Sequence, residues 1–246
     1  MAQDRDEVTV LTMNSDHQSG PVFFASLPCE SHGKETPKGP GTDGEAKLHL
    51  VSTLWDHLAA SENPLWKRGK SSNRDDYQIQ VVHGTLGRPQ LLLGESRGPA
   101  ISFSKGGGRI WAALCGDDSD IGIDVAESDE FRRDYPVQRV FHPEELEHAL
   151  SLADGDPENA SALLWSIKEA VVKALGCAFH FVDPRQITVY PAAEGNGEYI
   201  FPVGLSGKAL MRFPLAAGGP LRVSSLRRGK LWLSFALVNR RPAGHG

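Results

Sequence analysis

The chain has 246 residues, of which 40% are hydrophobic, and a formal net charge of −5 at pH 7. This length can bury a substantial core in one large or two small domains, and no stretch approaches a transmembrane span. The polar N-terminus has no signal-peptide pattern, and the three cysteines, Cys29, Cys115 and Cys177, are far apart. We therefore expect a cytoplasmic protein with reduced thiols, no zinc cluster and no membrane contact.

The charge is unevenly placed along the chain. No acidic residue follows Glu198, whereas eight basic residues do: Lys208, Arg212, Arg222, Arg227, Arg228, Lys230, Arg240 and Arg241. A basic C-terminal segment could meet an acidic protein or a nucleic acid. Solvated strand faces and a tail are the simpler explanation, and a nucleic-acid partner would rest on this charge alone, so we expect none.

The N-terminal third predicts short strands, a loop and one helix. Alternating apolar residues indicate strands at Val8–Met13, Val22–Ser26 and Tyr77–Val82. Residues 28–46 are rich in Gly, Pro, Lys and Glu and predict a flexible loop, and Lys67–Arg74 predicts a basic loop. Leu50, Leu54 and Leu58 share one side of a helix expected over Leu48–Ala60.

Two glycine-containing turns follow. Gly87-Arg88-Pro89 predicts a turn, and Ser102-Phe103-Ser104 ends a strand that leads into Lys105 and three glycines. A lysine beside exposed backbone amides suits a phosphate, although a glycine-rich hairpin loop explains Gly106–Gly108 equally well. The glycine spacing does not fit a dinucleotide-binding fingerprint.

An acid-rich region surrounds the next two strands, which we expect at Arg109–Leu114 and Ile121–Val125. Residues 117–134 contain eight carboxylates: Asp117, Asp118, Asp120, Asp124, Glu127, Asp129, Glu130 and Asp134. This density favours a nearby divalent cation, although we expect most of these side chains to be solvated. Asp124 differs because it lies in an apolar strand, where a carboxylate needs a metal or hydrogen-bond partners.

A helix ending near Gly176 carries the other candidate residues. Asp156 is a good N-cap, Pro157 suits a first turn and Gly176 a C-terminal cap. Trp165, Glu169 and Lys173 are four residues apart and share one side, and Lys168 lies about 100° around the helix from Glu169. The pattern suits a metal-plus-phosphate site, but Glu169 and Lys173 could also be an ordinary surface ion pair.

Apolar periodicity predicts one more helix and four strands. A helix is expected from Phe141 to about Leu152, with His142 at its start. Strands are expected at Gln186–Tyr190, Tyr199–Val203, Leu221–Ser225 and Leu231–Val238.

Two of these segments together resemble the 4′-phosphopantetheinyl transferase superfamily. The family pattern is a strand with Gly-Ile-Asp-x-Glu, followed some forty residues later by a helix with Trp-x-x-Lys-Glu-Ala-x-x-Lys. The chain has Gly122-Ile123-Asp124-Val125-Ala126 and then Trp165-Ser166-Ile167-Lys168-Glu169-Ala170-Val171-Val172-Lys173. Length and motif position resemble the two-halved, Sfp-type branch, and the resemblance covers roughly residues 85 to 190. The helix motif is specific, whereas Gly-Ile-Asp alone is weak.

The resemblance implies an α+β fold of two similar halves with coenzyme A between them. Residues 1–120 would form the half with the nucleotide-contacting loops, and residues 121–246 the half with the metal site and the Lys-Glu-Ala helix. A two-halved member is expected to act as a monomer. No internal duplication is visible in the sequence itself.

The implied reaction moves the 4′-phosphopantetheine arm of coenzyme A to a serine of an apo acyl or peptidyl carrier protein. By resemblance, Asp124 and Glu169 would bind Mg²⁺, and Glu169, or a water it holds, would accept the serine proton. Lys168 and Lys173 would contact the phosphates. Four residues would hold the nucleotide end: Arg88, Ser102, Ser104 and Lys105.

Two positions depart from the family pattern. Phe103 stands where the family has a histidine that meets the 3′-phosphate, and Ala126 stands where it has a second acid. Glu127 could replace that acid only if the strand bulges or ends first. These departures support an alternative function: a degenerate relative that binds coenzyme A or a carrier protein without catalysis.

Overall fold

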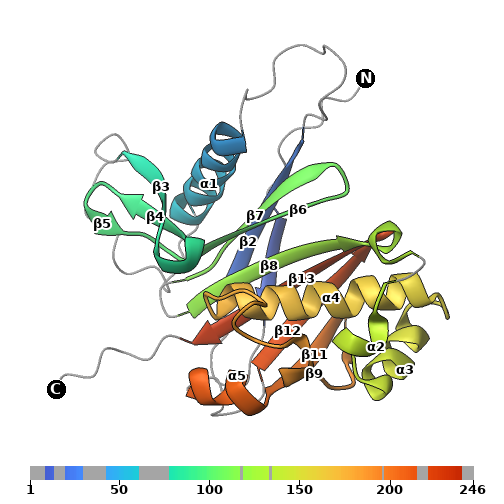
Figure 1. Ribbon diagram of the computed structural model, residues 1–246. Helices are drawn as coiled ribbons and strands as arrows, with labels where there is room; N and C mark the ends of the chain where they lie inside the picture. Colours follow the sequence, from blue (N-terminus) through green and yellow to red (C-terminus); the bar gives the residue numbers. More distant parts are fainter. Residues whose placement is uncertain are drawn as a thin grey trace, which may run out of the picture. The chain divides into compact units, whose positions relative to one another are not determined.

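The computed structural model describes residues 9–13, 20–29, 43–60, 78–116, 119–132, 135–195, 197–214 and 221–239. The chain divides into two units, Met1–Asp120 with Arg240–Gly246 and Ile121–Asn239. Each unit contains antiparallel sheet and helix (Figure 1), so the expected α+β fold class is confirmed. Within the described ranges, no helix is both long enough and apolar enough to cross a membrane.

The first unit contains a sheet of strand order β1-β2-β7-β6 and a smaller sheet of order β3-β4-β5. Its strands are β1 (Thr9–Met13), β2 (Gly20–Pro28), β3 (Ile79–His83), β4 (Pro89–Leu93), β5 (Ser96–Arg97), β6 (Ile101–Gly106) and β7 (Arg109–Leu114). A short 3₁₀ turn, η2 (Thr85–Gly87), joins β3 to β4. The helix α1 (Asp43–Ala60) buries Leu50, Leu54 and Leu58 against this unit's core, as their spacing predicts.

Two local features of the first unit bear on the sequence expectations. The helix α1 begins at Asp43, so the loop expected over 28–46 is too long at its end, and Ala46 is buried in the core. Acidic residues in the first turn, Asp43 and Glu45, favour this earlier start. Gly107 and Gly108 have positive φ and form the turn between β6 and β7, which is the glycine-rich hairpin loop. The basic loop expected at Lys67–Arg74 lies outside the described residues.

The second unit is built on one sheet of strand order β10-β11-β12-β13-β8, with β9 also paired to β11. The strands are β8 (Ser119–Glu127), β9 (Ile187–Val189), β10 (Ala193–Gly195), β11 (Glu198–Leu205), β12 (Leu221–Arg228) and β13 (Leu231–Asn239). In the described part of the sheet β8 ends the order, so the strand that carries Asp124 is an edge strand of this path.

Helices and 3₁₀ turns complete the second unit. They are η3 (Ser128–Phe131), α2 (Val137–Val140), α3 (Pro143–Leu152), α4 (Pro157–Ala174), η4 (Pro184–Gln186) and α5 (Gly207–Arg212). Apolar periodicity predicts α3 and α4 but not the shorter segments, because a few residues carry little periodicity.

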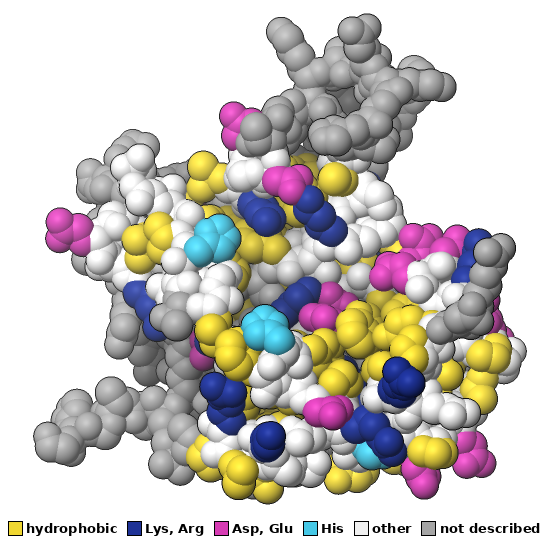
Figure 2. All heavy atoms as spheres, viewed as in Figure 1, with side chains coloured by type: hydrophobic (Ala, Val, Ile, Leu, Met, Phe, Trp, Pro, Cys, Tyr) yellow, Lys and Arg dark blue, Asp and Glu magenta, His cyan; other side chains and the backbone are white. Residues whose placement is uncertain are grey.

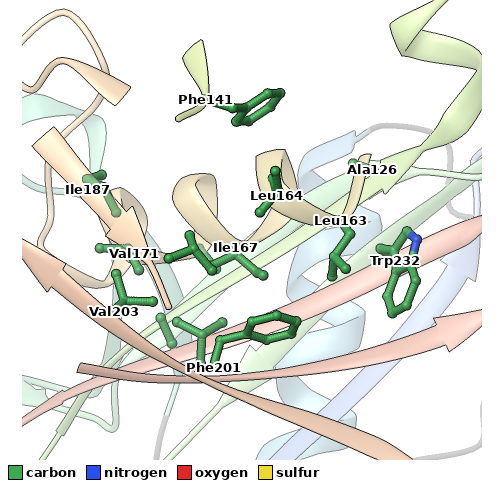
Figure 3. Packing of buried hydrophobic residues seen from close by; sticks show 14 of the residues in the cluster. Ala126, Phe141, Leu163, Leu164, Ile167, Val171, Ile187, Phe201, Val203 and Trp232 are labelled. Carbon is green, nitrogen blue, oxygen red and sulfur yellow. The ribbon is translucent and has the colours of Figure 1, made fainter. Parts of the chain in front are cut away.

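The long helix α4 crosses the sheet and supplies one side of the core. Its start is fixed as expected, because the Asp156 side chain accepts a hydrogen bond from the backbone N–H of Glu158 at 3.0 Å. Figure 3 shows side chains of α4 packed over the sheet. The fully or almost fully buried residues of this hydrophobic cluster include Leu163, Leu164, Ile167 and Val171 from α4 and Phe201, Val203 and Trp232 from the sheet. Each such side chain contributes roughly 1.5–3 kcal/mol by leaving water.

The backbones of α4 and β8 approach each other closely at Gly122. A Cβ atom at this position would lie 1.9 Å from the carbonyl oxygen of Ala170 and 2.6 Å from the backbone nitrogen of Ala174. Both are backbone atoms of α4, so they cannot move aside as a flexible side chain would. Gly122 therefore allows β8 and α4 to pack at a distance that any other residue would prevent.

We predict that Gly122→Ala destabilises the protein by about 3 kcal/mol or more, since the helix must move away from the strand. The measurement is the free energy of unfolding in urea. Gly229→Ala is the matched control, because Gly229 has positive φ but open space around its Cβ position. The control substitution should cost only about 1–2 kcal/mol of backbone strain. Equal losses for the two variants would contradict the close contact.

Candidate active site

The candidate site begins with Asp124 on β8. Its side chain is 9% exposed and accepts a hydrogen bond from Lys173 Nζ at 2.6 Å, and this ammonium also donates to the carbonyl oxygen of Ile123 at 3.1 Å. A carboxylate in a strand of buried residues is costly unless it is paired. Lys173 provides that pairing and joins the end of α4 to the middle of β8.

Glu169 lies one helical turn before Lys173 and belongs to the same charged group. Burial raises the pKa of Glu169 to about 6, repulsion from Asp124 adds to this rise, and Lys173 opposes it. The helix α4 and the strand β8 therefore bring together three of the expected site residues, Asp124, Glu169 and Lys173. A carboxyl group with a pKa near neutrality can accept a proton more readily than an ordinary glutamate.

Two further residues join this charge environment. Partial burial raises the pKa of Glu130, and repulsion from Asp124 contributes, against a hydrogen bond that Glu130 accepts from the Glu127 backbone. Burial also raises the pKa of Tyr135 to about 12, helped by Glu169 and Glu130. The sequence pattern predicts mostly solvated acids over 117–134 and does not single out Tyr135. The positions of Glu130 and Tyr135 near Asp124 and Glu169 depend on the tertiary fold, which short-range pattern does not reveal.

Aromatic side chains border the same stripe of α4. The ring of Trp165, one turn before Glu169, lies 4.9 Å from that of Phe179, 6.3 Å from that of Tyr135 and 6.4 Å from that of Phe131, centroid to centroid. In Figure 2, acidic side chains gather over the end of β8 and the start of α4, the region that contains η3. The stripe therefore has an apolar border at Trp165 and acidic residues around η3.

Lys168 does not join this group, although it precedes Glu169 in the chain. Its side chain has no exposed surface. The Lys168 ammonium donates to Glu145 Oε2 at 2.8 Å and to the carbonyl oxygens of Pro184 at 3.0 Å and Val140 at 3.2 Å. These bonds use all three hydrogens of an ammonium group. The structure therefore places Lys168 in the interior, which corrects the expectation of a phosphate contact.

The residues expected at the nucleotide end lie in the first unit. Arg88 Nη2 lies 2.7 Å from Asp120 Oδ1, and the exposed Lys105 forms an ion pair with Asp43 at the start of α1. Asp43 raises the pKa of Lys105. Ser102 and Ser104 are both buried on β6. Phe103 between them packs against this unit's core, and Lys47 Nζ lies 5.5 Å from its ring centroid.

The position of the missing acid is part of the second unit's core. Ala126 is fully buried and packs in the same cluster as Leu163 and Trp232 (Figure 3). The strand β8 runs through Glu127, whose backbone is extended at φ −111° and ψ 139°. Alternation therefore directs Glu127 to the opposite side from Asp124 and Ala126. The condition under which Glu127 could replace the missing acid is not met.

The carboxylates fit a cation that needs few protein ligands. Across the described ranges, no group of three or more His, Cys, Asp or Glu residues is arranged to hold a metal ion. Asp124 is nevertheless close enough to Glu169 to contribute to the raised pKa of that carboxyl group, after burial. Mg²⁺ takes one or two carboxylates, with waters and substrate phosphates in its other positions, so this oxygen pair suits it.

Comparison with known proteins points to one family. Residues 120–212 match the family model of the 4′-phosphopantetheinyl transferase superfamily. This segment contains Asp124, Glu169 and Lys173, so the expected resemblance to the superfamily is confirmed there. The Sfp-type branch stays a prediction. No curated protein matches the chain.

Two solved structures from Chronobacterium ammoniagenes are similar to part of the chain. The ACPS–CoA complex is 22% identical, and the match covers 51% of this chain and 100% of the ACPS chain, with a TM-score of 0.40. The apo-ACPS structure is also 22% identical, covers 48% of this chain and 94% of its own, and gives a TM-score of 0.39.

The raised pKa of Glu169 predicts a pH-dependent effect on stability. Between its ordinary value of 4.5 and about 6, the folded state binds more protons than the unfolded state. Ionised Glu169 therefore weakens the fold above pH 6, and this penalty disappears as pH falls below 4.5.

We predict that Glu169→Gln stabilises the metal-free protein at pH 7.5 by at most about 2 kcal/mol, and that the difference fades by pH 4.5. Urea unfolding at a series of pH values measures both. Glu147→Gln, which removes an exposed carboxylate from α3, is the control. A Glu169→Gln variant that is less stable than the wild type at pH 7.5 would contradict this charge arrangement.

Proposed function

We propose that the chain transfers the 4′-phosphopantetheine arm of coenzyme A to a serine of an apo acyl or peptidyl carrier protein. The observation that carries the proposal is the meeting of Asp124 from β8 with Glu169 and Lys173 from α4, inside the segment that matches the superfamily. Neither motif alone is enough, because Gly-Ile-Asp strands and i,i+4 Glu–Lys pairs are common.

In the proposed reaction, a bond forms between the serine oxygen and the phosphorus that bears the pantetheine arm. The bond from that phosphorus to the bridging oxygen of the pyrophosphate breaks, and adenosine 3′,5′-bisphosphate leaves. Glu169, or a water it holds, takes the serine proton, because an acceptor with a pKa near neutrality suits that task. Lys173 is a fixed cation beside both carboxylates and stabilises negative charge on the phosphoryl oxygens.

Asp124 and Glu169 are the residues that would hold Mg²⁺. When bound, the ion supplies charge neutralisation at the pyrophosphate oxygens of coenzyme A. Burial raises the pKa of Glu169, and repulsion from Asp124 adds to this rise. A bound cation would relieve that repulsion.

Four residues of the first unit are the candidates for holding the nucleotide end of coenzyme A. Arg88 and Lys105 are the cationic candidates, and Ser102 and Ser104 the hydroxyl candidates. Each cation already has a carboxylate partner, so a phosphate would have to compete with Asp120 at Arg88 and with Asp43 at Lys105. The Lys105 pair is exposed and therefore easier to exchange.

A second candidate function is a coenzyme A- or carrier-binding relative without turnover. It is favoured by Ala126 and Phe103, whose positions are both occupied by core packing rather than by polar groups. Coenzyme A binding without transfer to any tested carrier would support this candidate.

The decisive experiment is intact mass spectrometry of purified apo acyl and apo peptidyl carrier proteins after incubation with the chain, coenzyme A and Mg²⁺. We expect one carrier to gain the mass of one phosphopantetheine arm, and we expect EDTA to prevent the gain. A transferase of known activity on the same carriers is the positive control. No gain on any carrier that this transferase modifies would count against the proposal.

We predict that Glu169→Ala abolishes this transfer, since both the proton acceptor and a cation ligand are lost. Glu147→Ala, which removes an exposed carboxylate from α3, is the matched control and should keep full activity. Circular dichroism verifies that both variants are folded. Full activity of folded Glu169→Ala would overturn the assignment.

A further inference from the structure

Lys168 is buried in the interior, so a contact with a substrate phosphate does not explain its position. Lysine is almost never fully buried unless it is paired. Lys168 and Glu145 have side chains that are 0% and 2% exposed and meet at 2.8 Å. Burial lowers the pKa of Lys168, and the nearby Glu145 opposes this shift. The shift is in the direction expected when a charged group loses its hydration.

The pair is the centre of a network that connects five elements of the second unit. Lys168 on α4 donates to carbonyl oxygens at the end of α2 and in η4. Glu145 on α3 accepts from the backbone N–H of Val189 on β9 at 2.7 Å and from that of His142, the residue before α3, at 2.9 Å. The Lys168 ammonium also lies 5.4 Å from the ring centroid of Phe141. Both oxygens of Glu145 and all three hydrogens of Lys168 therefore have partners.

The network acts on α4 from a different side than the Asp124 contact does. Successive residues of an α-helix are about 100° apart, so Lys168 and Lys173 lie about 140° apart around α4, and Glu169 lies between them. Lys173 attaches α4 to β8, and Lys168 attaches it to α2, α3 and η4. Two ionic attachments on different sides therefore restrain the rotation of α4 in addition to its apolar packing.

Stability alone is a weak reason for such a pair. A buried ion pair can often be replaced by apolar residues of similar volume without loss of stability, so a role in conformational specificity is the better explanation for this pair. Glu169 follows Lys168 in the chain, and the direction of its side chain is important for the proposed chemistry. A rotation of α4 by one residue would turn Glu169 by about 100° away from Asp124.

We propose that the buried Glu145–Lys168 pair is a positioning device that sets the rotation of α4, so that Glu169 and Lys173 face Asp124. This rests on the proposed function for its effect on catalysis. Glu145 and Lys168 are then positioning residues that touch neither coenzyme A nor the carrier protein. Nothing in the sequence pattern singles out Glu145, which comes from α3.

The test compares Lys168→Met, Glu145→Gln and the double variant with the wild type. Each single variant leaves one buried charge without its partner and should be the least stable. The double variant removes both charges and should recover much of the melting temperature. Ser166→Ala is the control, because Ser166 is also buried on α4 and donates to the carbonyl oxygen of Leu163, but lies outside the network.

We predict that kcat of the transfer falls about tenfold or more in both single variants and does not recover in the double variant, because small misplacements of catalytic groups are costly. The losses should be non-additive, as expected for one device. The KM for coenzyme A should stay within about threefold throughout, and Ser166→Ala should lower the melting temperature with little change in kcat.

Two kinetic results would overturn the proposal. Recovery of kcat together with stability in the double variant would make the pair a stabilising contact only. A rise in the KM for coenzyme A in Lys168→Met that Glu145→Gln does not share would make Lys168 a ligand contact.

If the wild-type chain transfers no phosphopantetheine arm, the proposed function fails, and this outcome is separate from the positioning role. The positioning claim is then decided by ¹³C NMR of lysine-labelled protein, which needs no turnover. A shifted Lys173 Cε signal in all three variants, with an unchanged signal in Ser166→Ala, supports the device. A Lys173 signal that none of the three variants moves would overturn it.

Discussion

The contact of Lys173 with Asp124 ties the longest helix of the second unit to the edge strand of its sheet. This contact needs α4 to approach β8 so closely that a side chain at residue 122 would strike the helix backbone. The apolar cluster beneath α4 stabilises this packing. The ion pair adds a specific contact between one residue of the helix and one residue of the strand, and both of these charges act on the pKa of Glu169.

Charge burial is the recurring cost of this arrangement. Asp124, Glu169 and Lys168 all give up much of their hydration, and each is compensated differently. Lys173 compensates Asp124, a saturated network compensates Lys168, and Glu169 is left with a pKa raised to about 6. In Glu169, burial and the charge of Asp124 act together against ionisation, and Lys173 offsets them only in part. A residue in that condition gains most from a bound cation or from accepting a proton, which are the two roles that the proposed reaction assigns to it.

Sequence pattern was sufficient for the helix and strand that carry the site. The Asp156 cap, the apolar periodicity of α4 and the apolar strand around Asp124 all depend on residues close in the chain, and each has the expected structure. The partner of Lys168 could not be read in this way. Helical spacing gives the angle between Lys168 and Glu169, but Glu145 reaches Lys168 only through the packing of α3 on α4. Glu130 and Tyr135 are not predicted from the sequence for the same reason, because their positions near Asp124 and Glu169 depend on the tertiary fold.

If Asp124 and Glu169 form one site for a cation and the pyrophosphate of coenzyme A, the binding of coenzyme A must depend on both the cation and Asp124. Calorimetric titration of coenzyme A into the wild type, Asp124→Asn and Glu147→Gln, each with and without Mg²⁺, measures this dependence. We expect Mg²⁺-dependent binding to the wild type and Glu147→Gln, and a loss of that dependence in Asp124→Asn. Binding of coenzyme A that is unaffected by Mg²⁺ and by the Asp124 substitution would show that the two carboxylates do not form this site.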